Sequence, residues 1–157
     1  MKKIRILCVG KTRERYLKDG LAALSKKIGF YCDFCAVIVK EARYASGNLA
    51  QWVQFEEKGI LRHLSARNFT VVCDERGVCM TSAALADSFA QWANQGHSRL
   101  DFVVGGAYGV SDAVRKKANL LLSFSPMTMP HQMFRLFLYE QIYRVLTIIK
   151  GEKYHHI

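Results

Sequence analysis

The sequence lacks a long apolar run that is free of charged residues. Its most apolar region, residues 133–149, is interrupted by Arg135, Glu140 and Arg144, whereas a membrane-spanning helix needs about 18 or more consecutive apolar residues. The apolar stretch that follows the basic N-terminus covers only residues 6–9, which is too short for a signal peptide. We therefore predict a cytoplasmic protein with no membrane partner.

Acidic residues are scarce, because 13 Asp and Glu face 23 Lys and Arg, for a formal net charge of +10. The excess is greatest in residues 2–19, and a second basic run covers residues 115–117. A field of this sign attracts polyanions, with nucleic acid as the first candidate and anionic lipid as the second. A solvated surface without a partner is the alternative.

The five cysteines form an odd set with no secretory signal, which favours a reducing compartment over a disulfide framework. Cys32 and Cys35 form a C-x-x-C pair, but residues three apart on the strand predicted over 31–39 point to opposite faces. Cys73 and Cys79 do not have the spacing of a second zinc-ligand pair. We predict that the protein binds no metal.

Apolar periodicity predicts a single domain over residues 1–157, in which short strands alternate with helices. The predicted strands are 4–9, 31–39, 69–73, 100–104 and 120–124, and a turn is predicted at 74–77. The predicted helices are 12–27, 46–64, 82–93, 111–118 and 130–150. This order indicates an α/β fold with a largely parallel sheet of five to six strands and helices on both faces. In the helix predicted over 46–64, Leu49 and Trp52 lie on the apolar side and Glu56 on the polar side.

The last predicted helix carries apolar residues on more than one face. The sheet can cover only one of these faces. The simplest cover for the rest is the same helix of a second copy, so we predict a homodimer. Burial of this helix within its own monomer is the alternative.

The strand ends lack two common nucleotide-binding fingerprints. Gly109 is followed by Val-Ser rather than by the Lys-Ser/Thr of a phosphate-binding loop. The first strand is followed only by Gly10-Lys11-Thr12, without the glycine pattern of dinucleotide-binding domains or common Rossmann-like methyltransferases. Instead, residues 73–77, 105–109 and 125–131 follow the last three strands of the predicted sheet, where ligands bind in open parallel sheets.

These segments resemble those of the SPOUT methyltransferases, most closely the bacterial family that methylates N3 of a pseudouridine in large-subunit ribosomal RNA. The similarity runs from residues 4–11 through the glycine loop at 103–109 to the C-terminus. Its most specific part is Leu122-Ser-Phe-Ser-Pro-Met-Thr-Met-Pro-His-Gln-Met133, which continues into residues 135–144 and 151–156. The resemblance implies a C-terminal trefoil knot, a rare exception to the rule that chains do not thread loops.

The resemblance also implies S-adenosylmethionine as cofactor and large-subunit ribosomal RNA as substrate. The methyl donor would be held by the ends of the last strands, mostly through main-chain groups. The residues that this assigns to the cofactor are Cys73, Gly105, Phe124, Ser125, Pro126, Met127, Thr128 and Met129. Cys73 departs from the family pattern, in which an aliphatic residue is usual, and we expect little effect because the backbone does most of the binding.

Methyl transfer to an imide nitrogen requires that the nitrogen lose its proton and that donor and acceptor be held in line. The residues predicted to take part are His131, Arg135, Tyr154 and His155, with His156, Arg144 and Lys153 as further candidates. The residues do not decide which of them is the base, and His131 could instead only cap or pack against the last helix. A non-catalytic RNA-binding or ribosome-associated module and a nucleotide-dependent oxidoreductase are the alternative functions.

Overall fold

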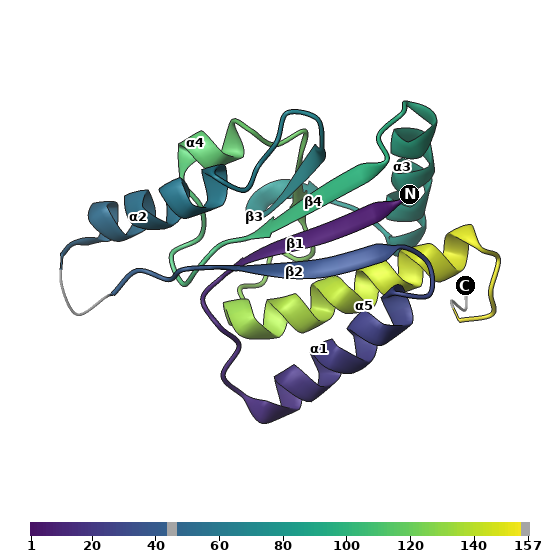
Figure 1. Ribbon diagram of the computed structural model, residues 1–157, viewed down its shortest axis with the longest axis horizontal. Coiled ribbons are helices and arrows are strands. Elements are labelled where there is room, and N and C mark those ends of the chain that lie inside the picture. The colour runs from purple at the N-terminus through teal and green to yellow at the C-terminus, as the bar shows by residue number, and fades with distance from the viewer. Residues whose placement is uncertain (44–46, 155–157) are drawn as a thin grey trace.

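The computed structural model describes residues 1–43 and 47–154. Five strands alternate with five helices along this part of the chain (Figure 1). The strands are β1 (Lys3–Val9), β2 (Asp33–Val39), β3 (Phe69–Cys79), β4 (Arg99–Val104) and β5 (Leu120–Ser123). The helices are α1 (Arg15–Ile28), α2 (Leu49–Leu61), α3 (Ser82–Asn94), α4 (Asp112–Arg115) and α5 (His131–Ile149).

The strands form one sheet in the order β2-β1-β4-β3-β5, and every neighbouring pair is parallel. Parallel neighbours require a crossover between them, and the helices provide these crossovers. The predicted α/β class is therefore confirmed, with five strands in the described part of the chain.

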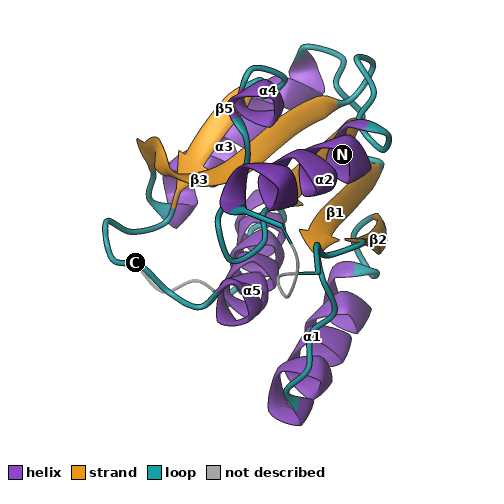
Figure 2. Cartoon of the chain, turned by 90° about the vertical axis from the view of Figure 1, so that its left-hand side faces the viewer, coloured by secondary structure: helices purple, strands orange, loops and turns teal. Residues whose placement is uncertain are grey.

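Both faces of the sheet are covered, as Figures 1 and 2 show. On one face, Ile4, Ile6 and Cys8 of β1 belong to a large apolar cluster with residues of α1, α3 and α5. On the other face, the alternate residues Leu7 and Val9 pack in a smaller cluster with α2 and α4. This alternation follows from the period of two along a strand, so a single strand contributes to both layers.

Helix α5 lies between α1 and α3 beneath the sheet. Much of its apolar surface, including Leu138, Ile142 and Val145, is therefore buried within its own chain. This arrangement accounts for a large part of the apolar excess that suggested a second copy. Met133 and Phe137 remain 46% and 41% exposed, so the same helix still carries an uncovered apolar strip.

The predicted turn at 74–77 is wrong, because β3 continues through it to Cys79. Cys73 and Val78 both pair with Leu122 of β5, so the residues between them form an irregularity within the strand. Gly77 permits this, since a Cβ there would lie 2.6 Å from backbone atoms of Leu121 and Leu122. Pairing with β5 therefore resumes after the irregularity, where the sequence predicted that the strand had ended.

Three further expectations, on Glu56, Leu49 and Cys32, require correction. Glu56, assigned to the polar side of its helix, is buried, and its Oε1 accepts a hydrogen bond of 3.0 Å from the amide of Ala42. Leu49, assigned to the apolar side, is exposed. Cys32 lies in the turn before β2 rather than on the strand, and all five cysteines are free.

Helix starts follow the polar signals in the sequence. Asn48 and Gln51 form a reciprocal capping box at α2, and Thr81 caps α3 by accepting a hydrogen bond from the amide of Ala84. Pro130 directly precedes α5, as predicted. Among residues 1–43 and 47–154, no helix has the length and apolar character that a membrane crossing requires.

Candidate functional site

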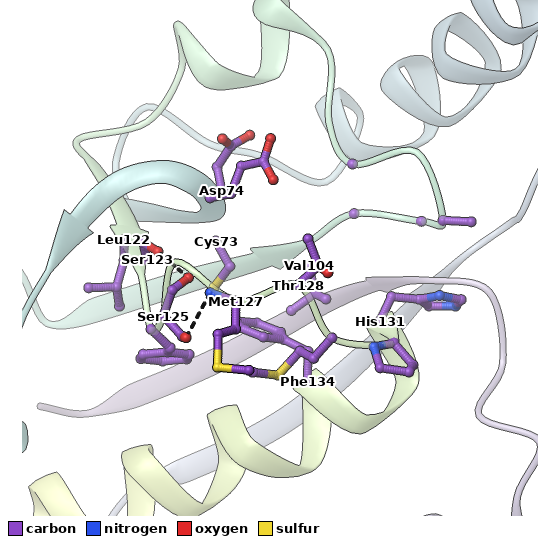
Figure 3. Close-up of a pocket in the computed structure, with 18 residues that line it drawn as sticks. Cys73, Asp74, Val104, Leu122, Ser123, Ser125, Met127, Thr128, His131 and Phe134 are labelled. Carbon is purple, nitrogen blue, oxygen red and sulfur yellow. Dashed lines mark hydrogen bonds between the residues drawn. The ribbon is translucent and has the colours of Figure 1, made fainter.

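A cavity of about 440 Å³ lies beyond the carboxyl ends of β3, β4 and β5 (Figure 3). These three strands are neighbours in the sheet and run in the same direction, so their last residues meet at one edge. The residues that line the cavity come from three strand ends and from the start of α5: Cys73, Asp74, Glu75, Val104, Gly105, Gly106, Ala107, Gly109, Leu122, Ser123, Phe124, Ser125, Met127, Thr128, Met129, Pro130, His131 and Phe134.

The glycine loop forms one wall of this cavity. The amide of Gly109 donates to the carbonyl of Gly106 over 3.1 Å, which closes a tight turn with Gly109 at a φ of +75°. A Cβ added at Gly106 would lie 2.7 Å from Oε2 of Glu56, so this buried side chain would have to shift for any larger residue to fit. The buried Glu56 carboxylate of α2 therefore lies directly behind the glycine loop and limits how closely α2 and the loop can approach each other.

Helix α2 contacts the same loop a second time. The rings of Trp52 and Tyr108 stack with centroids 5.6 Å apart. Glu56 and Trp52 lie four residues apart, hence on one face of the helix. This face of α2 thus supports the glycine loop from outside the cavity.

The loop after β5 forms the opposite wall. The Ser125 hydroxyl accepts a hydrogen bond of 2.9 Å from the amide of Met127, and the Ser123 hydroxyl donates to the carbonyl of Ser125 over 3.2 Å (Figure 3). The rings of Phe124 and Phe134 stack at 5.2 Å and anchor this loop on α5. Two local hydrogen bonds and an aromatic contact therefore shape the wall before any ligand binds.

Asp74 provides the most strongly held charge at the cavity. Its Oδ2 lies 2.7 Å from Nε of Arg115, its Oδ1 accepts from the amide of Arg76 at 3.0 Å, and its side chain is only 5% exposed. The carboxylate is thereby fixed by a cation and a backbone donor. Glu75, the next residue, also lines the cavity but is exposed to solvent.

Seven of the eight residues predicted to bind the cofactor line the cavity, and the remaining one, Pro126, does not. Cys73 lies at its base, where burial raises the pKa of the thiol well above its ordinary value. The thiol is therefore protonated at neutral pH and is not a nucleophile there. Whether these residues bind a cofactor stays a prediction.

His131 also lines the cavity, at the first position of α5. Burial is the main cause that lowers the pKa of its imidazole, and the charges of Arg135 and Arg13 lower it further, while Glu41 opposes them. The ring is therefore neutral at pH 7 and can accept a proton. Of the four residues predicted to be catalytic, only His131 lines this cavity in the described part of the chain.

Arg135 is buried one turn further along α5 and does not line the cavity. Its guanidinium donates to the carbonyls of Val9 and Gly10 and, over 3.0 Å, to the hydroxyl of Thr12. These contacts tie the start of α5 to the end of β1. A role at the reacting atoms stays a prediction, and its contacts favour a supporting role.

Tyr154 lies beyond the opposite end of α5. Its hydroxyl donates to the carboxylate of Glu140 at 3.1 Å, and the guanidinium of Arg144 lies 4.8 Å from the centre of its ring. Burial is the first cause of its raised pKa, and the hydrogen bond with Glu140 is the second. His155 and His156 lie outside the described residues, so the predictions for them are not placed.

Sequence reasoning missed the roles of Glu56 and Asp74. Neither has a motif of its own, although Asp74 does follow a predicted strand. In the ranges 1–43 and 47–154, no group of His, Cys, Asp or Glu side chains is arranged to hold a metal ion.

Comparison with known proteins supports the same reading. A sequence family described as "Predicted SPOUT methyltransferase" matches residues 1–155. Proteins named ribosomal RNA large subunit methyltransferase H are similar to this chain. The one from Bifidobacterium animalis is 42% identical over 156 residues and the one from Caldicellulosiruptor saccharolyticus 38% over 155. These alignments cover 97% of this chain and 98% and 99% of the relatives.

Two solved structures share the fold at 12% sequence identity and a TM-score of 0.57. A probable methyltransferase from Bordetella pertussis aligns over 92% of this chain and 95% of its own, and a tRNA methyltransferase from Aquifex aeolicus over 99% and 76%. The chain therefore belongs to the SPOUT methyltransferase family, and the resemblance found in the sequence is confirmed. It is an enzyme of the methyltransferase class.

Proposed function

We propose that this protein transfers the methyl group of S-adenosylmethionine to N3 of a pseudouridine in the RNA of the large ribosomal subunit. One observation carries the proposal. The cavity built from the ends of β3, β4 and β5 contains the segments with the most specific family resemblance, and the chain aligns over nearly its full length with relatives named for this class of substrate.

The cavity suits a nucleoside with an amino-acid tail. Its volume of about 440 Å³ falls in the usual range for small-molecule sites, about 300 to 1,000 Å³. Leu122, Phe134 and the side-chain-free Gly105 offer apolar, close-approach surfaces for a purine and an alkyl chain. Glu75 offers a carboxylate to an ammonium group at the mouth. When bound, S-adenosylmethionine would supply an activated methyl group on a sulfonium centre.

His131 is the proton acceptor that the geometry favours. The imide N–H of the target must lose its proton before or during methyl transfer. A neutral imidazole on the cavity wall can take that proton, and its lowered pKa keeps it neutral at the pH of the cytoplasm, where we propose that the protein works. The walls on either side hold donor and acceptor in line and exclude water.

A homodimer would complete the site. Tyr154 lies beyond the end of α5 remote from His131, and about 27 Å of helix separates residues 131 and 149 at 1.5 Å per residue. Within one chain Tyr154 and the cavity are therefore far apart. A two-fold partner packed on the exposed strip of Met133 and Phe137 would allow one copy to hold the donor and the other to contact RNA.

The C-terminal trefoil knot belongs to the same proposal. In this fold the segments after β4 and β5 would be threaded so that the cofactor loops cannot separate without unthreading. An experimental structure with the whole C-terminal segment traced would test it.

Calorimetry with S-adenosylmethionine tests the proposal directly. We expect saturable binding by the wild type and loss of binding when Gly106 is replaced by Val, because its side chain would collide with Glu56. A non-catalytic RNA-binding module would bind RNA but not the methyl donor. A nucleotide-dependent oxidoreductase would bind NAD instead, and either result would refute the proposal.

A further inference from the structure

A second hollow, of about 680 Å³, lies at the same edge of the sheet as the cofactor cavity. It is formed beyond the carboxyl ends of β1 and β2. The residues that line it are Gly10, Lys11, Thr12, Arg13, Lys18, Ile38, Val39, Lys40 and Glu41. This hollow is called the basic groove below.

The basic groove carries four cationic side chains and one carboxylate. The cations are those of Lys11, Arg13, Lys18 and Lys40, all solvent-exposed. Glu41 lies 3.6 Å from the Arg13 guanidinium, so it neutralises one cation. Three lysines from two loops and a helix therefore surround one hollow, and the described residues of its wall include no acid besides Glu41. This arrangement attracts an anion with several charged groups spread along it.

The basic groove and the cofactor cavity are structurally joined. In the sheet, β1 is the direct neighbour of β4, so the pair β2-β1 adjoins the three strands β4-β3-β5. The two hollows therefore occupy neighbouring stretches of one edge. The first turn of α5 contacts both. His131 lines the cofactor cavity, and the next residue, Gln132, accepts a hydrogen bond of 2.7 Å from the amide of Arg13 in the basic groove. Arg135 binds Gly10 and Thr12 on the same wall.

We infer that the basic groove binds backbone phosphates of the RNA strand that flanks the methylated nucleotide. The inference rests on the proposed function. A target base in the cofactor cavity places its flanking backbone along the same edge of the sheet, where the lysines lie. The cations are exposed and spread out, which suits a passing strand rather than one small buried ion. Phosphate contacts would position the RNA without reading its sequence.

The test replaces the three lysines together, as K11Q/K18Q/K40Q. Arg13 is kept, because its backbone and its pairing with Glu41 shape the groove. The matched control, K26Q/R67Q/R99Q, removes the same charge from exposed residues at or near the opposite, amino edge of the sheet. Four quantities are compared: the Kd for S-adenosylmethionine, kcat and KM for methylation of unmodified large subunits, and the salt dependence of binding to an rRNA fragment.

For the groove variant we expect KM to rise about tenfold or more at 0.15 M salt, with kcat and cofactor Kd within about threefold of wild type. The slope of log K against log salt should become shallower by about 2, at about 0.7 for each lost single-strand contact. The control should match the wild type in cofactor Kd, kcat, KM and the slope of the salt dependence.

Equal effects in the groove variant and the control would overturn the inference, since they would report total charge alone. So would an unchanged KM in the groove variant. A wild-type protein that binds no S-adenosylmethionine would instead refute the proposed function, and the RNA-binding measurement would still separate the groove variant from the control.

Discussion

His131 combines three properties that bear on catalysis. It begins α5, it lines the cofactor cavity, and its pKa is lowered by burial and by neighbouring arginines. A base that works at neutral pH needs a position within reach of the substrate and a pKa below the working pH. Arg135 and Tyr154, the other predicted catalytic residues in the described part of the chain, do not line the cofactor cavity within one protomer.

We predict that His131→Asn retains cofactor affinity but lowers kcat for methyl transfer about 100-fold or more, because general base catalysis of this kind contributes about 10²- to 10⁴-fold. In the wild type, kcat/KM should fall as the pH drops through a pKa below the ordinary value of a histidine, where the imidazole becomes protonated. Rates measured from pH 5 to pH 8 would check this. An acid limb that is the same in the variant would assign the titration to another group.

Arg135 was predicted to take part in catalysis, and its contacts in the structure point to a further, supporting role. Its place in the family motif suggested a role with the substrate anion. In the structure, its guanidinium donates to two backbone carbonyls and one hydroxyl near the end of β1. Its buried Nε has no acceptor among the described residues. These contacts hold the start of α5 against the end of β1.

We therefore predict that Arg135→Met lowers the free energy of unfolding by about 2 to 4 kcal/mol, since the carbonyls of Val9 and Gly10 would lose a charged donor. Urea unfolding would measure this. Below the unfolding transition, kcat should stay within about threefold of wild type. A 100-fold loss of kcat with full stability would instead place Arg135 at the reacting atoms.

At the scale of elements, β3 and β5 depend on one close approach. An alanine Cβ at position 77 would lie 2.6 Å from the backbone of β5, and backbone atoms cannot move aside as a flexible side chain can. Because Cys73 and Val78 both pair with Leu122, the irregularity at this point sets where the wall of the cofactor cavity begins.

Gly77→Ala should destabilise the protein by about 1 to 3 kcal/mol through overpacking and weaken cofactor binding with it. Thermal unfolding and calorimetry would measure the two effects. Gly96→Ala serves as a control for general glycine effects: no atom lies within 4 Å of an added Cβ there, although its φ of +90° also disfavours alanine. Equal losses in both variants would show that the close approach to β5 is unimportant.

Local sequence signals predicted these elements well but not their tertiary surroundings. The alternation of strands and helices depends on neighbouring residues, and the sequence predicted it correctly. Glu56 was assigned to the polar side of its helix because helical periodicity depends only on residues of the helix itself. It does not reveal that the amide of Ala42, outside the helix, donates a hydrogen bond to the Glu56 carboxylate. The residues of the cofactor cavity came from family resemblance, since no periodicity brings three strand ends together. For the basic groove, the sequence indicated only an excess of basic residues near the N-terminus.

At the scale of the whole molecule, the strip formed by Met133 and Phe137 is where a second copy would pack. The two residues lie four apart on α5 and share one face. We predict a dimer of the wild type in sedimentation, and a monomer for M133E/F137E, which places two carboxylates on the interface. Methylation should be lost in that variant if Tyr154 of one copy completes the site of the other.

Phe30→Glu changes a residue that is more exposed than Met133 or Phe137 but lies outside the strip that they form, and it should leave the dimer intact. A wild type that is monomeric and fully active would contradict the proposal that two copies build the site.

The most direct test of the central claim is mass spectrometry of nucleosides from large-subunit ribosomal RNA of cells lacking this gene, compared with the same cells complemented by wild type or by His131→Asn. The account predicts that N3-methylated pseudouridine is absent without the gene and restored by the wild type, but not by the variant. The same set of methylated nucleosides in cells with and without the gene would contradict it.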